Sequence, residues 1–389
     1  RSRWGGLADS TTLLLGPLTG EESGELVDRL FSEHPPSAAT RARIVEAAEG
    51  NPLFIEQMGA MLEDAGAPAQ DEPVVPPTIH ALLAARLERL PGDERDAIER
   101  AAVIGREFWA GAVAALGADD DRGAQALHAL VRKLLVQPTE SRFQGEDAFR
   151  FQHQLIREVA YDSVPKTLRA ELHERFADWF ERTAPASEPE TQELLGYHLE
   201  QAYRYRSELD LGGWETIGVR ARDLLYAAGR RAVTRGDVHA AVGLLGRAAE
   251  ITPAGDDARA DVLTELAEAL RESGDFARSD FVLAEALALA AAGEHRAVEA
   301  QATLARLRVR MATTHDLASA EIERVVEESI AALDQLGDER RLAKAWFLRA
   351  WLEWLGCHAM DSAESSRRSA EHARRAGDER GQAQALHLL

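Results

Sequence analysis

A turn motif that recurs about every 40 residues in the second half of the chain constrains the fold more than any other feature. Residues 235–237 (Arg-Gly-Asp) and 273–275 (Ser-Gly-Asp) lie 38 positions apart, and each stands between two stretches rich in alanine and leucine. Glycine supplies the backbone conformation that ends a helix and starts a turn. The motif therefore predicts pairs of helices joined by short turns.

Weaker copies of this turn continue the pattern toward residue 389. Residues 314–316 and 355–357 occupy similar places, and the connectors at 292–294, 336–340 and 376–380 resemble one another at spacings of 44 and 40 residues. A period of this length is typical of helical solenoids. We expect residues 190–389 to form about four helical hairpins that resemble a tetratricopeptide-repeat array, although the spacing leaves the repeat subtype open.

The first 66 residues predict a smaller helical part. A short buried strand is expected at residues 13–15, and Thr19 and Glu22 have the spacing of a capping box that opens a helix through about residue 31. Ser37 can cap a second helix, which ends at Gly50, and a third covers about residues 53–64. The proline-rich stretch at 66–77 then predicts a linker.

Residues 74–185 predict three helices followed by a β-hairpin, which is the order of elements in a winged helix. The hairpin is expected from residues 135–137 and 149–151, with a polar turn around Gly145. The preceding helix, at about residues 119–134, has apolar residues at helical spacing that predict one buried face: Leu127, Leu130, Val131, Leu134 and Leu135. The predicted fold class is mainly α: a helical lid, a winged-helix-like domain with one small hairpin, and an α-solenoid.

Composition narrows the possible partners and surroundings. The 389 residues carry a net charge of -21, which repels phosphate backbones and anionic membrane surfaces, so no nucleic acid or membrane is expected as a partner. One cysteine excludes an intramolecular disulfide, and no apolar run is long enough to cross a membrane. A cytoplasmic location is expected. Because neither end has the features of a natural terminus, the chain is also expected to be a fragment.

The sequence offers no catalytic motif. It has three lysines, and none follows a glycine, as the phosphate-binding lysine of a Walker A loop must. Nucleophile-elbow, zinc-protease and Cys-x-x-Cys patterns do not occur either, and Cys357 beside His358 is not expected to bind a metal. We therefore expect no catalysis by this chain alone.

Two short segments are informative about function because of their order in the chain. The first contains Gly50, Asn51 and Pro52, where glycine can end one helix and proline can begin the next. The second contains His153, at a predicted strand-to-helix junction, followed by a run through residues 155–161 and 172–175. Together with the later repeats, this order resembles the STAND class of AAA-related ATPases, as in cyclase–ATPase–repeat proteins and large LuxR-type regulators.

The resemblance implies a regulatory role that depends on nucleotide. In that class the proline packs near the adenine of ATP or ADP, and the histidine contacts the β-phosphate of ADP, so Gly50, Pro52 and His153 become the candidate cofactor-binding residues. Gln154 stands where the class often has aspartate, so the chain departs from the pattern of the class at this position. A protein or small molecule would bind the repeats, the intact protein could self-associate, and an upstream output domain such as a nucleotide cyclase is expected.

Two other functions remain open: a free-standing helical-repeat adaptor and a DNA-binding transcription regulator. The helix at about 119–134 has no net charge across residues 119–122, 132 and 133, which disfavours DNA. The repeats also contain an aromatic cluster. Phe347, Trp351 and Trp354 share one helical face, and Trp346 lies near them in the sequence. Packing between repeats is one interpretation of this cluster, and a partner-binding patch is the other. The arginine pairs at 367–368 and 374–375 are expected on solvated faces.

Overall fold

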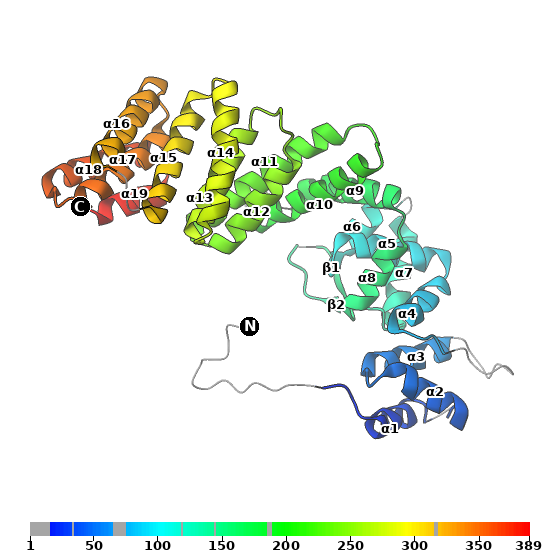
Figure 1. Ribbon diagram of the computed structural model, residues 1–389. Helices are drawn as coiled ribbons and strands as arrows, with labels where there is room; N and C mark the ends of the chain where they lie inside the picture. The colour runs from blue at the N-terminus through cyan, green and yellow to red at the C-terminus, as the bar shows by residue number, and fades with distance from the viewer. Residues whose placement is uncertain are drawn as a thin grey trace. The chain divides into compact units, whose positions relative to one another are not determined.

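The chain divides into two compact units, residues 1–184 and 185–389, which are described one at a time. The computed structural model describes residues 16–32, 35–64, 75–117, 120–143, 145–184, 189–314 and 318–389. The predicted strand at 13–15, most of the predicted linker, and residues 315 and 316 of one predicted turn lie outside the described residues. The described part of the chain is mainly helical and contains one small sheet, as predicted (Figure 1).

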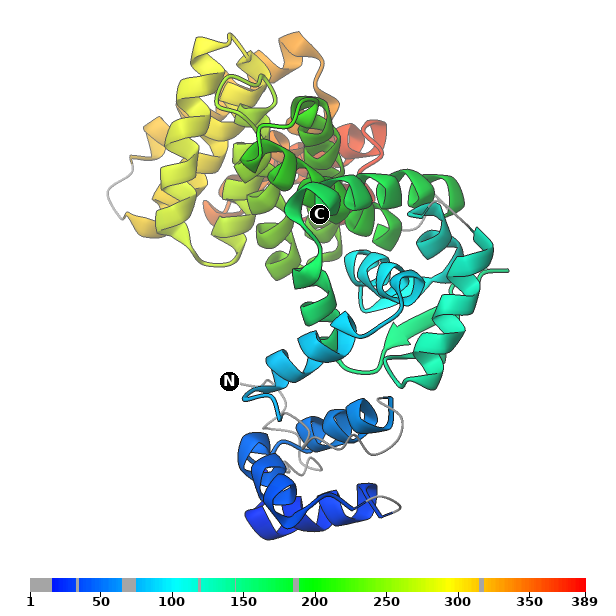
Figure 2. The same cartoon turned by 90° about the vertical axis from the view of Figure 1, so that its right-hand side faces the viewer.

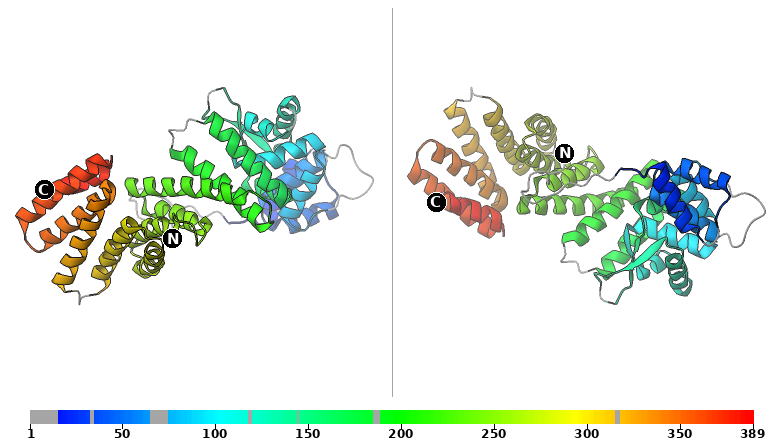
Figure 3. Two further views of the ribbon diagram at one scale, coloured as in Figure 1. Left: turned by 90° about the horizontal axis from the view of Figure 1, so that it is seen from above. Right: turned by 90° about the horizontal axis from the view of Figure 1, so that it is seen from below.

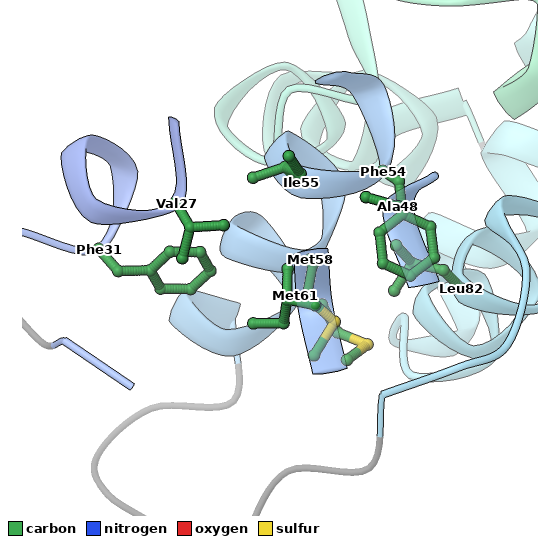
Figure 4. Packing of buried hydrophobic residues seen from close by; sticks show 9 residues of the cluster. Val27, Phe31, Ala48, Phe54, Ile55, Met58, Met61 and Leu82 are labelled. Carbon is green, nitrogen blue, oxygen red and sulfur yellow. The ribbon is translucent and has the colours of Figure 1, made fainter. Parts of the chain in front are cut away.

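The first unit begins with three short helices: α1 (Gly20–Leu30), α2 (Ala38–Ala48) and α3 (Pro52–Asp64). The predicted capping box is confirmed, because Thr19 N donates to Glu22 Oε2 at 2.8 Å and Glu22 N donates to Thr19 Oγ1 at 3.2 Å. Ser37 caps α2 as expected. Figure 4 shows the core that the three helices enclose. Its largest buried side chains are Val27, Phe31, Ile44, Phe54, Ile55, Met58 and Met61, joined by Leu82 of the next helix.

The rest of this unit surrounds a three-stranded antiparallel sheet in the order β1-β3-β2. Along the chain two helices, a strand, two further helices and a hairpin precede the last two helices. The elements are α4 (Ile79–Glu88), α5 (Gly92–Ile104), β1 (Glu107–Trp109), α6 (Ala110–Ala115), α7 (Asp120–Arg132), β2 (Val136–Thr139), β3 (Ala148–Phe151), α8 (Gln154–Ser163) and α9 (Lys166–Thr183).

The predicted hairpin is confirmed, with Val136 opposite Phe151 and Thr139 opposite Ala148. The sequence did not indicate the third strand, β1, because three residues between two helices are too few to show an alternating pattern. The buried face predicted for the helix at about residues 119–134 was wrong at the C-terminal end of that helix. Helix α7 stops at Arg132, and Leu134 has a φ of 54° and is 60% exposed, because the chain must turn there to enter β2.

The second unit is a succession of antiparallel helices, and the predicted helical repeats are confirmed. Figure 2 and Figure 3 show these helices following one another in chain order. After α10 (Pro189–Glu208), the hairpins are α11 (Trp214–Arg235) with α12 (Val238–Ile251), α13 (Arg259–Glu272) with α14 (Phe276–Ala292), α15 (Arg296–Thr313) with α16 (Ser319–Leu336), and α17 (Glu339–Leu355) with α18 (Ala359–Arg375), followed by α19 (Glu379–His387).

The turns between these helices share one hydrogen-bond pattern. In six of them the first residue after the turn donates its N–H to a carbonyl five positions back, as Asp237 does to Ala232 at 2.9 Å and His358 does to Glu353 at 2.8 Å. Four of the six have glycine at positive φ followed by an aspartate that caps the next helix: Asp237, Asp275, Asp338 and Asp378. In the other two, Glu294 and Cys357 take the left-handed conformation in place of glycine.

No helix in the described ranges combines the length and apolar character that crossing a membrane requires.

Candidate functional site

The turn between α2 and α3 requires glycine at position 50. Gly50 has a φ of 75°, and its carbonyl accepts a hydrogen bond from Leu18 N at 2.8 Å. A Cβ at this position would lie 2.3 Å from the carbonyl oxygen of Leu18. Gly50 is therefore fixed by close backbone packing, which is sufficient to account for it without a ligand.

Pro52 is the first residue of α3 and is exposed. Asn51 caps the helix, since its Oδ1 accepts from Leu53 N at 3.0 Å. Proline suits this first position because its fixed φ is helical and it has no N–H to satisfy. The Pro52 ring is thus accessible at a helix N-terminus, and its predicted contact with a nucleotide stays a prediction.

His153 lies where the sequence placed it, between β3 and α8. It is the N-cap residue of α8 in extended conformation, and its half-buried ring makes no capping hydrogen bond. Among the described residues, no hydrogen bond or ion pair joins His153 to Gly50 or Pro52. A helix N-terminus and an imidazole both suit an anion, and the contact of His153 with the β-phosphate of ADP stays a prediction.

Several polar residues after His153 form contacts within this unit. Arg157 Nε donates to the carbonyl of Ala102 at 3.0 Å, and the Tyr161 hydroxyl lies 3.0 Å from His173 Nε2. Arg169 stacks over the Tyr161 ring at 4.3 Å. Burial, followed by the charges of Arg157 and Arg169, lowers the pKa of His173 to about 3, so its imidazole is neutral at neutral pH.

Arg86 is a buried residue that the sequence reasoning missed. It is 2% exposed and donates to Gln57 Oε1 on α3 and to the carbonyl of Lys133 at the end of α7. One side chain on α4 thus connects the three-helix part with the sheet-containing part of the first unit. Arginine in a helix usually points to solvent, so only a tertiary structure could identify this role.

In the second unit, charged side chains from α13, α15 and α17 form one network. Lys344 Nζ donates to Glu265 at 3.0 Å and to Glu268 at 3.3 Å. Gln301 on α15 bonds both carboxylates and also accepts from Arg341 Nε at 2.7 Å. Arg341 in addition pairs with Asp261 on α13, 80 positions earlier in the chain. The network therefore links three successive hairpins.

Neighbouring charges shift the pKa values of Glu268 and Lys344 in this network. Burial opposes the charged form of Glu268, but Lys344 and Arg308 hold its pKa below the usual range. Burial likewise opposes the charged form of Lys344, yet Glu265 and Glu268 raise its pKa. Both groups are therefore charged at neutral pH. The Tyr226 hydroxyl of α11 extends the network by donating to Asp261 at 2.5 Å.

The aromatic residues of α17 continue the same helical face as Lys344. Phe347, Trp351 and Trp354 follow Lys344 at helical spacing, and Lys344 points to α13. Trp351 is 37% exposed and Trp354 is 56% exposed, which disfavours the interpretation that these two residues pack between repeats. They form an aromatic stripe beside the charged network, defined here as Phe347, Trp351 and Trp354.

Trp346 points to a different surface, between α16 and α18, and lines a pocket there. Arg368 stacks over its ring at 4.7 Å and still has an exposed side chain. The arginine pairs at 367–368 and 374–375 are exposed, so the predicted solvated faces are confirmed. Within the described ranges, no group of three or more histidine, cysteine, aspartate or glutamate side chains could hold a metal ion.

No protein-family model matches the chain. An uncharacterized protein of Rhizobium meliloti (strain 1021) is 30% identical over 184 residues, which cover 45% of this chain and 18% of that protein. The chain therefore matches less than a fifth of this relative's length.

Two solved structures are similar at low TM-score. One is the Signal Transduction ATPase with Numerous Domains (STAND) protein with a tetratricopeptide repeat sensor from Pyrococcus horikoshii, with 14% identity, a TM-score of 0.34, and coverage of 97% of this chain and 57% of that one. The other is aspartyl phosphate phosphatase F from Bacillus subtilis, with 10% identity, a TM-score of 0.39, and coverage of 97% and 81%.

Proposed function

We propose that this chain is the regulatory, partner-sensing part of a cytoplasmic STAND-type signalling ATPase. The observation that carries the proposal is the order of its parts. A glycine turn opens α3 with Pro52, His153 stands at the N-cap of α8 directly after β3, and helical repeats follow. The chain itself has no catalytic role in this proposal, and ATP or ADP belongs to the intact protein.

The sheet-containing part acts as the winged helix of this assembly. The order α5, β1, α6, α7, β2, β3 supports this assignment, as does the antiparallel sheet with the hairpin at its end. His153 would contact the β-phosphate of bound ADP, and Pro52 would pack near the adenine. Arg86, which bonds to both Gln57 and the end of α7, would transmit the nucleotide state between the two parts.

The repeats serve as the sensor. A protein or small-molecule ligand that binds them would favour exchange of ADP for ATP and an open, self-associating state, provided that it binds this state more tightly. The aromatic stripe supports this role, because exposed tryptophans beside a charged network are typical of interaction surfaces. An upstream output domain, such as a nucleotide cyclase, would then receive the signal.

Nucleotide binding by the full-length protein tests the proposal. We expect fluorescent ADP to bind, and His153→Ala to weaken binding about tenfold, the loss of one charge-assisted hydrogen bond. His128→Ala is the matched control, because this histidine of α7 is exposed and its ring lies 2.7 Å from the carbonyl of Ala124 on the same helix. Absence of ADP and ATP binding by the full-length protein would favour the helical-repeat adaptor instead.

DNA binding through α7 is the less favoured alternative. Lys133, one of the two basic residues at the end of this helix, lies 2.8 Å from Glu94 in an ion pair. A cation neutralised in this way contributes little to phosphate binding.

A further inference from the structure

A pocket of about 320 Å³ lies between α16, α17 and α18, and none of the residues discussed for nucleotide binding lines it. Helix α16 contributes one wall, α18 contributes the opposite wall, and Trp346 of α17 lies between them. The lining residues are Glu327, Ile330, Ala331, Asp334, Trp346, Arg349, Arg368 and His372. This volume is within the range of small-molecule sites in proteins.

The charges of the lining are separated by sign. Glu327 and Asp334 of α16 are seven positions apart, so they share one helical face with Ile330 between them. Both are exposed, and their carboxylates have no hydrogen bond or ion pair with any other described residue. The cationic residues Arg349 and Arg368 come from α17 and α18. The pocket therefore has an acidic side and a basic side.

The basic side is held in place by neighbouring carboxylates. Arg349 Nε donates to Glu353 at 2.9 Å, and Arg368 Nε donates to Glu364 at 3.2 Å. Their guanidinium carbons lie 5.3 Å and 4.7 Å from the centre of the Trp346 ring. Because each of these bonds uses Nε, the terminal NH₂ groups remain available to a ligand. Arginine so positioned suits a carboxylate, which it can bind through two parallel hydrogen bonds.

We propose that this pocket binds a small zwitterion, a ligand with an ammonium group, a carboxylate and an apolar side chain. The ammonium group pairs with Glu327 and Asp334, the carboxylate pairs with Arg349 and Arg368, and the apolar side chain lies on Trp346 and Ile330. Amino acids and short peptides both have this chemistry. Binding here requires no nucleotide and is independent of the function proposed above.

Isothermal titration calorimetry of the complete chain with three kinds of ligand tests this proposal. The ligands are free α-amino acids (L-leucine, L-phenylalanine), dipeptides of the same residues, and the dipeptides with an acetylated N-terminus or an amidated C-terminus. We expect at least one zwitterion to bind, and blocking either charge to weaken binding about tenfold or more. A preference for α-amino acids or for dipeptides tells which charge separation the pocket accepts.

Matched variants locate the site. Glu327→Gln and Arg368→Gln should each weaken binding about tenfold, whereas Glu323→Gln and Arg374→Gln, which change exposed residues of the same two helices outside the lining, should not. Thermal unfolding checks that each variant is folded. The proposal is overturned if no zwitterion binds at millimolar concentration, if blocked ligands bind equally well, or if the lining variants bind as the wild type does.

Discussion

At the residue scale, His173 shows how burial gives one side chain a measurable effect on stability. Its ring contacts the Tyr161 hydroxyl, and burial lowers its pKa to about 3, from 6.5 in the exposed state. The unfolded chain therefore binds a proton between these values and the folded chain does not. This group's contribution to stability is complete above about pH 6.5 and is lost as the pH falls below it.

We expect this histidine to make the first unit less stable in mild acid. Between pH 7.5 and pH 5.0 its titration lowers the free energy of unfolding by about 2 kcal/mol. In urea unfolding at several pH values, His173→Gln should start from a lower stability but lose correspondingly less of it over this range. His128→Gln, at an exposed position, should retain the wild-type dependence on pH. An unchanged slope in His173→Gln would contradict the assignment.

At the element scale, the repeat turns are alike in hydrogen bonding but differ at one position. Gly274 and Cys357 occupy equivalent turns, with φ of 85° and 62°. A residue with a Cβ in this conformation lowers the stability of the fold by about 1 to 2 kcal/mol. Glycine avoids this strain, although it loses somewhat more chain entropy on folding. The turn at Cys357 is therefore strained in a way that the turn at Gly274 is not.

Exchanging these residues should produce effects of opposite sign. Cys357→Gly is expected to raise the free energy of unfolding of the repeats by about 0.5 to 1 kcal/mol, and Gly274→Ala to lower it by about 1 kcal/mol. Both positions lack close neighbours that would confuse the comparison: Cys357 is exposed, and a Cβ on Gly274 meets no atom within 4 Å. Thermal or urea unfolding measures the change. Destabilisation by Cys357→Gly would show that the cysteine side chain has a contact role.

At the scale of the whole repeat unit, the charged network joins hairpins that are not neighbours in the chain. Arg341 and Lys344 of α17 reach carboxylates of α13, and Gln301 of α15 lies between them. Repeat proteins mostly have contacts between adjacent repeats. These ion pairs therefore add a constraint beyond nearest-neighbour packing, on the face that also presents the aromatic stripe.

Replacing Lys344 should lower the free energy of unfolding, because Glu265 and Glu268 lose their ion pairs with it. Lys344→Met keeps the length of the side chain but removes the ammonium group that pairs with Glu265, which is 6% exposed, and with Glu268. We expect a loss of about 2 kcal/mol in urea unfolding, less than for a fully buried pair because Lys344 is partly exposed. Arg324→Gln, in an exposed ion pair with Glu328, should change stability by less than about 0.5 kcal/mol. Equal effects of the two variants would contradict a constraining role for the network.

Local sequence determined the helices, their caps and the repeat. Glycine and aspartate at residues 236–237 and 274–275 act on their own backbone and on the next turn of helix. The turns and helix caps that they form can therefore be recognised from the sequence. The same holds for the capping box at Thr19 and for the hairpin before His153. The nucleotide role of Gly50, Pro52 and His153 stays a prediction from resemblance, because the geometry of those segments is also explained by packing and helix starts.

Only the tertiary structure decided which polar and aromatic side chains meet. Strand β1 exists because β3 offers an edge for pairing, and Leu134 is exposed because the chain must turn into β2. Arg86, the network around Lys344 and the pocket at Trp346 each join residues from separate helices. Helical periodicity gives the face of a residue on its own helix, but not which neighbouring helix covers that face, and this choice left Trp354 exposed.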